Sequence, residues 1–215
     1  MKGYFFTFEG IDGCGKSTQL SRTAGALRAR GANILVTREP GGPPISEKIR
    51  EILISPDNSA MFPETECLLY LAARAQHVRE VIKPAVERGQ IVLCDRFEQA
   101  TFAYQGYGRG LEVPFLKDIN SFAAGGISPD ITFIFDIPVE LSQERLSRIG
   151  KGKDRMESEG AAFFGRVREG YLNAARLSPG KIRLLDGSKG LDELTGEILG
   201  IIEARIAGQD AGQYE

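Results

Sequence analysis

Residues 10–17 read GIDGCGKS, and this stretch decides which fold to expect. It matches the pattern GxxxxGK[ST] in full. It lies between a short aromatic run at 3–9 (GYFFTFE) and a segment of good helix formers at 17–30. A strand, this pattern and a helix, in that order, form a loop whose backbone N–H groups and helix dipole bind phosphate. A chance glycine turn is the alternative, and the flanking strand and helix argue against it.

The loop supplies a set of residues expected to surround the phosphates of a nucleoside triphosphate. They are Gly10, Ile11, Asp12, Gly13, Cys14, Gly15, Lys16, Ser17 and Thr18. Lys16 is expected to reach the β- and γ-phosphates, and Ser17 to hold the accompanying Mg²⁺. Cys14 lies near a helix N-terminus, where thiol pKa values fall, but a small residue filling a crowded loop explains it sufficiently. Mg-ATP or Mg-GTP is the expected ligand.

Strands alternate with helices along the rest of the chain. Strand-like runs follow at 33–37 (NILVT), 90–94 (QIVLC), 130–136 (DITFIFD) and 181–185 (KIRLL). Helices are expected at 45–54, 64–88 with a kink at Lys83-Pro84, 139–149, 161–177 and 191–206. This alternation predicts an α/β, three-layer P-loop NTPase fold, in which a five-stranded parallel sheet is flanked by helices. Ligands of such sheets bind beyond the carboxyl ends of the strands.

The composition indicates a globular protein, with one domain expected over residues 1–215 and a frayed tail at 207–215. Of the 215 residues, 42% are apolar and 26% are charged. Lys and Arg number 27 against 29 Asp and Glu, so no basic field exists for a nucleic-acid backbone and no nucleic-acid partner is expected. The apolar run near the N-terminus is too short for a signal peptide or a membrane span, so no membrane association is expected.

Cysteine usage predicts neither a zinc site nor a disulfide framework. Cys14, Cys67 and Cys94 form no CxxC pair, and His77 is the single histidine. Reduced thiols are typical of the cytoplasm, which is the expected location.

Two arginines are expected at the carboxyl edge of the sheet, because they follow the second and third strands. Arg38 lies in 37–42 (TREPGG), a loop broken by proline and glycines, and can bind a second phosphate. In 95–97 (DRF), Asp95 can hold magnesium-bound water while Arg96 binds phosphate oxygens. The ordinary interpretations are that Arg38 caps a loop and that Asp95 and Arg96 pair with each other.

A basic segment with two glycines is predicted to act as a small mobile lid over about 145–157. Its cations are Arg145, Arg148, Lys151, Lys153 and Arg155. A solvated charged face is the ordinary interpretation of such a run. Lid closure excludes water and brings arginines to the charge of the transition state, which raises rates by about 10³ to 10⁵. Arg148 and Arg155 are the expected participants, with Lys151 as the alternative.

Taken together, these motifs resemble the bacterial thymidylate kinase family of P-loop nucleoside monophosphate kinases. The matching stretches are 8–18 (FEGIDGCGKST), 37–42 (TREPGG), 68–77 (LLYLAARAQH), 95–97 (DRF) and 103–110 (AYQGYGRG), within a resemblance that runs to about Tyr171. It implies transfer of the γ-phosphoryl group of Mg-ATP to dTMP, giving dTDP for dTTP biosynthesis, by a homodimer. The apolar stretches around 64–82 and 115–127 are candidates for the dimer face, and equally for ordinary core.

The resemblance also implies roles for individual residues in binding the acceptor. The dTMP-binding set is Asp12, Arg38, Tyr70, Arg74, Arg96, Thr101, Tyr104 and Gln105. Arg38 and Arg96 would bind the acceptor phosphate. Tyr70 would stack on thymine, unless it is plain helix core, and Arg74 would hydrogen-bond the base. Tyr104 would exclude a ribose 2′-hydroxyl.

The catalytic set implied by the resemblance draws on both the loop and the lid. It consists of Asp12, Lys16, Arg96, Arg148 and Arg155, with Ser17 and Asp95 as metal-binding residues. Asp12 would face the acceptor sugar. Some family members carry an arginine inside the phosphate loop, but residues 11–14 (IDGC) contain none, so the duty is expected to fall on the lid. His77 is not expected to act as a base, because phosphoryl transfer of this kind needs none.

Two rival functions remain open at this point. A kinase for another nucleotide or for a deoxynucleoside would share the loop and lid but need different base contacts. A GTP-binding switch would need an NKxD-type guanine motif, and the sequence contains neither NKxD nor TKxD.

Overall fold

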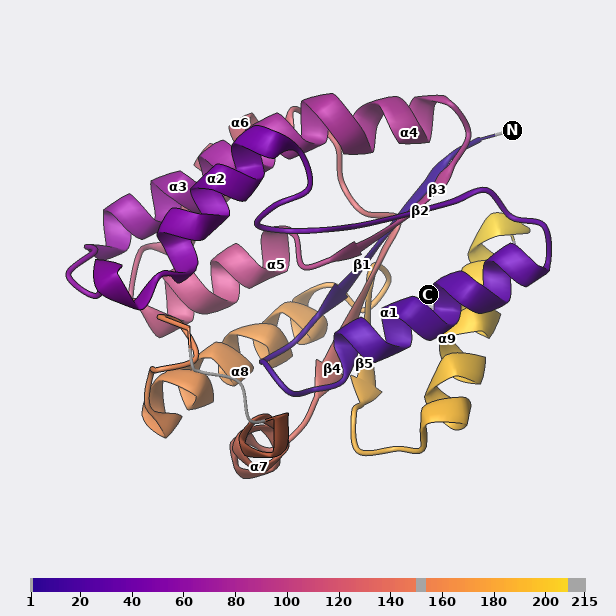
Figure 1. The fold of residues 1–215 in the computed structure, drawn as a ribbon. Helices are drawn as coiled ribbons and strands as arrows, with labels where there is room; N and C mark the ends of the chain where they lie inside the picture. Colours follow the sequence, from indigo (N-terminus) through magenta and orange to yellow (C-terminus); the bar gives the residue numbers. More distant parts are fainter. Residues whose placement is uncertain (1, 150–153, 209–215) are drawn as a thin grey trace.

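The computed structural model of the protein describes residues 2–149 and 154–208. Within them, five parallel strands form one sheet in the order β2-β3-β1-β4-β5 (Figure 1). The strands are β1 (Tyr4–Glu9), β2 (Ile34–Arg38), β3 (Ile91–Asp95), β4 (Ile131–Asp136) and β5 (Ile182–Asp186). The predicted five-stranded parallel sheet of an α/β P-loop fold is confirmed. Each strand begins one residue later than predicted, and β2, β3 and β5 also end one residue later, because pairing continues through polar residues such as Arg38 opposite Asp95.

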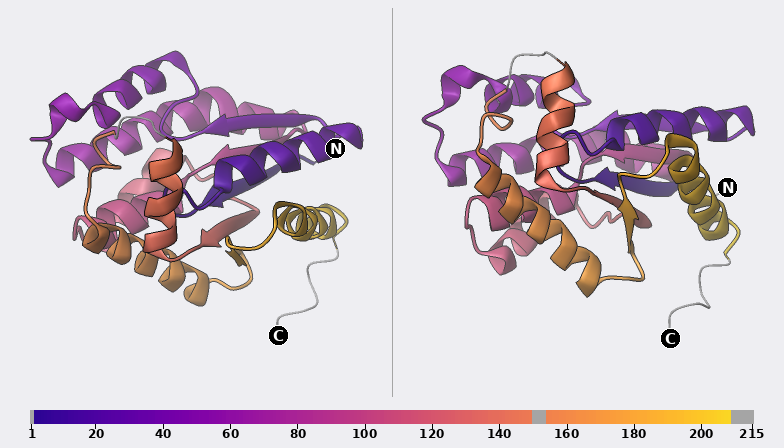
Figure 2. Two further views of the ribbon diagram at one scale, coloured as in Figure 1. Left: turned by 60° about the horizontal axis from the view of Figure 1, so that its bottom comes forward. Right: turned by 90° about the horizontal axis from the view of Figure 1, so that it is seen from below.

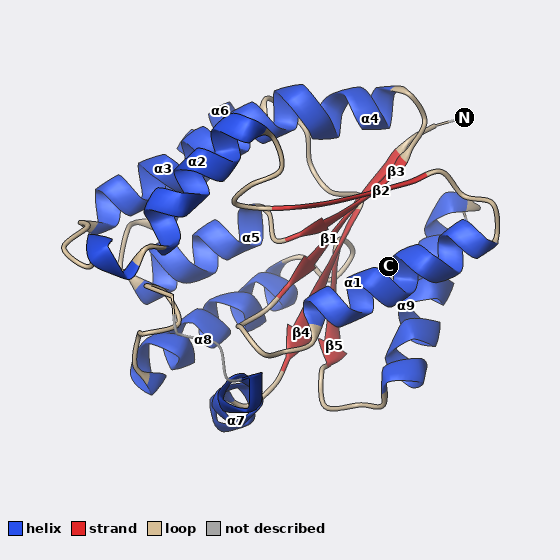
Figure 3. Ribbon diagram, in the orientation of Figure 1, coloured by secondary structure: helices blue, strands red, loops and turns tan. Residues whose placement is uncertain are grey.

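Helices cover both faces of the sheet (Figure 3). On one face, α1 (Lys16–Ala29) packs against α9 (Leu191–Ile206), and on the other lie α4 (Lys83–Glu87) and α8 (Ala161–Leu177). Next to these, α2 (Pro44–Ile54) packs on α3 (Pro63–His77), and α3 packs on α6 (Val113–Ala124). Figure 2 shows α7 (Val139–Ile149) beside the loop that precedes α1. In the part of the chain that is described, no helix is both long and apolar enough to cross a membrane.

The long helical region predicted over 64–88 is present as one continuous run, with a π-helical segment inside it. A π-helical segment, Val78–Ile82, separates α3 from α4, and the Lys83 N–H group donates to the Val78 carbonyl five residues back. Pro84 lies inside α4 and has no N–H group to continue regular α-helical bonding, which favours a widened turn just before it. The predicted kink is therefore a π-helical turn that begins upstream of the proline.

A second helical region was not predicted as an element at all. After the 3₁₀ turn at Pro56–Asn58 and the π-helical segment Val78–Ile82, a third irregular region consists of α5 (Glu98–Thr101) and the π-helical segment Phe102–Gly108 that continues it. Glycines and tyrosines in this stretch weaken its helical pattern. It forms because the segment packs along α8, a contact that only the folded chain provides.

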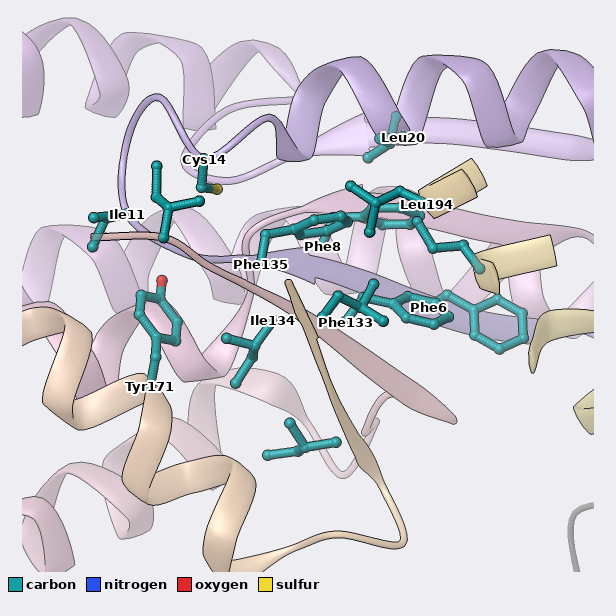
Figure 4. Packing of buried hydrophobic residues seen from close by; sticks show 14 of the residues in the cluster. Phe6, Phe8, Ile11, Cys14, Leu20, Phe133, Ile134, Phe135, Tyr171 and Leu194 are labelled. Atoms are coloured by element: carbon teal, nitrogen blue, oxygen red, sulfur yellow. The ribbon is translucent and has the colours of Figure 1, made fainter. Parts of the chain in front are cut away.

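The core beneath α1 is largely aromatic. Phe6 and Phe8 of β1 and Phe133 and Phe135 of β4 are fully buried, with ring centroids 5.4 Å apart for Phe8 and Phe133. Figure 4 shows these rings below Leu20 of α1. Burying one phenylalanine stabilises the fold by roughly 2–3 kcal/mol. The packing anchors β1, and with it the loop that β1 leads into.

Candidate active site

The phosphate loop is held tightly between β4 and α7. Gly10 and Gly13 have φ angles of 138° and 77°, and a Cβ atom on them would lie 2.7 Å from the Phe135 carbonyl oxygen and 2.8 Å from that of Ser142. Only glycine fits such positions. The Ser142 hydroxyl donates to the Asp12 carbonyl oxygen at 2.6 Å. The loop is therefore fixed in shape before any anion binds.

Arg145 provides a further support that the sequence did not reveal. The predicted lid began at this residue, but the structure places Arg145 in α7 with its guanidinium against the loop. Its Nη1 donates to the carbonyl oxygens of Gly13 at 3.3 Å and Gly187 at 3.2 Å. A cavity lined by residues 13–19 also reaches Arg145, Gly187, Lys189, Leu191 and Leu194. The last four carry no motif, because they approach the loop only through the tertiary fold.

Lys16 and Ser17 start α1, and each meets a carboxylate. Lys16 Nζ lies 3.4 Å from Asp12 Oδ1, and Ser17 Oγ donates to Asp95 Oδ2 at 2.5 Å. Hydroxyl and carboxylate oxygens are the ligand types that Mg²⁺ prefers. Cys14 is buried, and burial raises the pKa of its thiol, as expected for a packing residue and not for a redox switch.

Arg96 is the centre of a polar cluster at the carboxyl ends of β1 and β3. Its φ of 69° lies in the left-handed region, which costs a non-glycine residue on the order of 1 kcal/mol. The guanidinium donates to Asp12 Oδ1 at 2.7 Å, Tyr104 Oη at 3.0 Å and Tyr171 Oη at 3.1 Å. Burial raises the pKa of Asp12, but Arg96 and Lys16 outweigh it and hold that pKa well below its usual range. The strained backbone thus points a fixed cation at an ionised carboxylate.

Glu9, the last residue of β1, is linked to this cluster through Tyr171, which also contacts Arg96. The sequence analysis missed this role. The Glu9 side chain is fully buried and accepts hydrogen bonds from Phe97 N at 2.7 Å, Ala100 N at 3.4 Å and Tyr171 Oη at 3.0 Å. Burial raises the pKa of Glu9 to about 7, against the lowering effect of Arg96. Figure 4 shows the Tyr171 hydroxyl directed from α8 towards Ile11 and the phosphate loop.

A second cavity adjoins this cluster and contains about 610 Å³ of empty space, part of it open to solvent. Its lining is Asp12, Glu39, Pro40, Arg50, Ile54, Tyr70, Arg74, Arg96, Ala100, Thr101, Tyr104, Gln105, Asp154 and Met156. The structure therefore brings together seven of the eight residues predicted to bind the acceptor, all except Arg38. Burial raises the pKa of Tyr70, which keeps its hydroxyl neutral. Arg50 and Met156 are lining residues that no motif indicated.

Arg38 lies at the end of β2, outside the lining of this cavity. Its exposed guanidinium donates to both carboxylate oxygens of Glu47, at 2.9 Å and 3.0 Å. The Gly42 N–H group donates to the same carboxylate at 2.7 Å. Arg38 and the loop after it are thus tied to α2.

The two predicted lid arginines lie away from the phosphate loop in this conformation. Arg148 is exposed and pairs with Glu144 one helical turn earlier. Arg155 is buried, donating to Glu66 Oε2 at 2.6 Å and to the Leu53 carbonyl oxygen at 2.8 Å. The alternative Lys151, like Lys153, falls outside the described residues.

Glu66 is a further residue that sequence reasoning missed. It is fully buried and accepts hydrogen bonds from Gln105 at 2.9 Å, from Arg109 at 3.0 Å and from Arg155. Burial acts to raise the pKa of Glu66, but these donors lower it below the ordinary value. Gln105 and Arg109 lie 39 and 43 positions from Glu66 and Arg155 lies 89 positions away, so no local pattern marks the group.

These features define a class of protein. A P-loop kinase for a small phosphorylated acceptor needs three parts, and all three are present. They are a phosphate loop that starts a helix, an acid and an arginine at the end of the neighbouring strand, and a second cavity with aromatic and guanidinium groups. Asp12 lies between the two parts, since it contacts Lys16 of the loop and lines the second cavity.

Comparisons with known proteins identify the family. The family model described as thymidylate kinase matches residues 8–198. A thymidylate kinase of Pseudomonas syringae is 49% identical over 194 residues, covering 90% of this chain and 92% of the relative. A thymidylate kinase of Geobacter sulfurreducens is 47% identical over 209 residues, covering 95% and 98%. The crystal structure of thymidylate kinase from Ehrlichia chaffeensis superposes with a TM-score of 0.77 at 30% identity, covering 94% of this chain and 99% of that one.

The chain belongs to the thymidylate kinase family. Members of this family are nucleoside monophosphate kinases, and their reaction is the phosphorylation of dTMP to dTDP. The resemblance stated from the motifs is confirmed.

Proposed function

We propose that ATP binds in the cavity along residues 13–19 and dTMP in the cavity lined by Tyr70 and Arg74, with transfer of the γ-phosphoryl group between them. The observation that carries this proposal is the cluster of Asp12, Lys16 and Arg96, in which Asp12 pairs both with Lys16 of the first cavity and with Arg96, which lines the second cavity with it. Two anions brought together there face two fixed cations. The attacking oxygen of a monophosphate is already ionised near neutral pH, so positioning and charge neutralisation supply the catalysis.

On the donor side, Lys16 and the backbone of the phosphate loop would bind the β- and γ-phosphates. Lys16 keeps its charge, because the attraction of Asp12 and Asp95 outweighs burial and the repulsion of Arg96, so its pKa stays above the ordinary value. Arg145, which already donates to Gly13, would hold the loop while the nucleotide binds.

On the acceptor side, Arg96 would bind the 5′-phosphate with Asp12 as its counter-ion. Tyr104 would lie against the deoxyribose, since its hydroxyl is fixed by Asp12 at 3.1 Å and by Arg96 at 3.0 Å. Tyr70 would stack on the base. Arg38 would reach the acceptor phosphate only after leaving Glu47.

The oxygen donors at the strand ends fit Mg²⁺. Ser17 Oγ and Asp95 Oδ2 are in contact, and Asp12 is held ionised nearby. One or two protein oxygens are typical for this ion, which retains waters and binds substrate phosphates. When bound with ATP, Mg²⁺ would neutralise part of the phosphate charge.

Arg148 and Arg155 stay our candidates for the lid cations. Arg148 is exposed and, within the described part of the chain, has Glu144 as its one ion-pair partner, so a change of partner would cost little. Arg155 would have to leave the buried carboxylate of Glu66, which makes its recruitment more costly. Arg148 is therefore the first residue to test.

We also propose a homodimer, formed through α3 and α6. Large apolar side chains on these helices stay exposed, namely Leu68, Phe115 and Phe122, with Phe122 at 81% exposure.

We propose a cytoplasmic location, which fits the three buried, free cysteines.

The proposed function is tested by ADP release over a panel of acceptors, namely dTMP, dUMP, dCMP, dGMP and thymidine, with ATP or GTP as donor. The highest kcat/KM is expected for dTMP with ATP, and removing Mg²⁺ should abolish turnover. Comparable turnover of thymidine, which lacks the acceptor phosphate, would overturn the assignment of Arg96.

A further inference from the structure

We infer that Asn120 is a positioning residue for base selectivity, because it holds Arg74 so that the free edge of the guanidinium presents only hydrogen-bond donors to the base. The inference rests on the proposed placement of dTMP in this cavity. Asn120 lies on α6, is 2% exposed and does not line the cavity itself, so it would act through Arg74.

The hydrogen bonds of Arg74 account for three of its five N–H groups. Nε donates to Glu39 Oε2 at 2.7 Å, and Nη1 donates to Thr101 Oγ1 at 2.8 Å and to Asn120 Oδ1 at 2.5 Å. The guanidinium also lies over the Phe97 ring, with Cζ 4.8 Å from the ring centroid. The side chain is thus fixed by three hydrogen bonds, from Nε and Nη1, and by one ring contact.

The two N–H groups on Nη2 are the ones left over. Within residues 2–149 and 154–208, Nη2 has no hydrogen-bond partner, yet it is not among the fully buried polar atoms that lack one. The side chain of Arg74 is only 2% exposed and lines the acceptor cavity, so the accessible edge of the guanidinium faces that cavity. Arginine donates and never accepts, so this edge can bind only an acceptor atom.

This geometry separates bases by the group at ring position 4. Thymine and uracil carry a carbonyl oxygen there, which accepts from Nη2, whereas cytosine carries an amino group that would leave donor facing donor. A buried donor left without a partner costs about 1–3 kcal/mol, and sites built on such hydrogen bonds discriminate strongly. The discrimination requires that Arg74 cannot turn away, and a free arginine side chain has roughly 2 kcal/mol of rotamer entropy to regain.

Asn120 prevents that movement, and its own orientation is determined by its two partners. Its Oδ1 accepts from Arg74, and its Nδ2 donates to Glu98 Oε2 at 3.1 Å. The reverse amide orientation would face a donor with Arg74 and an acceptor with Glu98, so the assignment follows from the network. Glu98 lies outside the acceptor cavity, which leaves it available for substitution.

The test compares kcat/KM for dTMP and dCMP in the parent enzyme and in Asn120→Ala. We expect the dTMP-to-dCMP ratio to fall by about tenfold or more, mainly through a higher KM for dTMP. A general loss of structure would lower kcat/KM for both substrates by the same factor and leave their ratio unchanged. A ratio within about twofold of the parent would overturn the inference.

Two further variants keep the test decisive. Asn120→Ser shortens the side chain out of reach of Arg74 and replaces the alanine variant if that one does not fold. Asn120→Asp combined with Glu98→Gln reverses the second hydrogen bond and keeps an acceptor for Arg74, so most of the ratio should return. Failure of this double variant to recover it, despite a parent-like thermal midpoint, also counts against the inference.

The parent enzyme separates this inference from the proposed function. If it does not prefer dTMP over dCMP, the proposed acceptor site is wrong. If it does and the Asn120 variants retain the preference, only the role of Asn120 is wrong.

Discussion

The phosphate loop and the acceptor cavity are built in different ways, although they share Asp12. The loop is a local structure of consecutive residues, in which glycines permit the shape and the backbone groups are proposed to bind the phosphates. The acceptor cavity is a long-range structure, in which side chains from α3, α5 and the segment 102–108 meet through buried ion pairs such as Arg74 with Glu39. A substitution in the loop should therefore affect catalysis alone, whereas one in the cavity network should also change selectivity or stability.

The largest effect that this contrast predicts is at Lys16. Lys16→Met should lower kcat by about 10³-fold or more, because the lost charge neutralises the phosphates directly. The long apolar side chain fills the same space, so the thermal midpoint should shift by only a few degrees. Steady-state kinetics and a thermal scan measure both. A variant that loses activity because it unfolds would contradict the separation of loop from core.

Arg96 joins the two regions, and its replacement should combine their effects. Arg96→Lys keeps a charge but loses the fork that contacts Asp12, Tyr104 and Tyr171 together, so kcat/KM for dTMP should fall by about 10² to 10³. Arg96→Ala should lower it further. Activity of the lysine variant within about threefold of the parent would show that charge alone suffices and that the fork is dispensable.

The buried carboxylates allow a test by pH. The pKa of Glu9 is raised from 4.5 to about 7, so the folded protein holds this proton more tightly than the unfolded chain does. The stability due to the neutral carboxyl is present below pH 4.5 and is lost as pH rises through about 7. Relative to Glu9→Gln, which does not titrate, the parent should lose up to about 3 kcal/mol across this window. Urea unfolding at a series of pH values measures the difference.

Glu66→Gln is the matched control for that experiment. Glu66 is equally buried, but its donors lower its pKa, so its contribution changes only below the ordinary carboxyl range. Its unfolding free energy should therefore differ from the parent by a constant amount between about pH 5 and 8. Parallel curves for the parent and Glu9→Gln would contradict the raised pKa.

The same contrast explains which features the sequence predicts. The sheet and the loop are readable because their signals are local, namely short apolar runs between helices and glycines at a fixed spacing before Lys16. The roles of Glu9 and Tyr171, and the contact of the lid residue Arg145 with the phosphate loop, were missed because each depends on a partner distant in sequence, as Tyr171 does on Glu9 across 162 positions. A buried carboxylate after an apolar strand gives no sign of which donors will meet it.

Resemblance to a family supplied the acceptor residues that periodicity could not. It named Tyr70, Arg74 and Tyr104 before the structure brought them to one cavity. It gave no information on the two residues that hold Arg74, because they act on another side chain: Glu39 lies inside TREPGG but was given no role, and Asn120 lies in no motif.

The smallest effect concerns Tyr104, where ring and hydroxyl can be separated. Tyr104→Phe keeps the ring beside the expected deoxyribose and removes the hydrogen bonds to Asp12 and Arg96, so kcat/KM for dTMP should fall by less than about tenfold. Preference for dTMP over its ribonucleotide should persist, because the ring and not the hydroxyl occupies the space of a 2′-hydroxyl. Tyr104→Leu removes the ring and should relax that preference. If Tyr104→Phe weakens the preference for dTMP over its ribonucleotide as much as Tyr104→Leu does, the hydroxyl network and not the ring selects the sugar. Sugar and base would then both be selected by polar groups that hydrogen bonds hold in place.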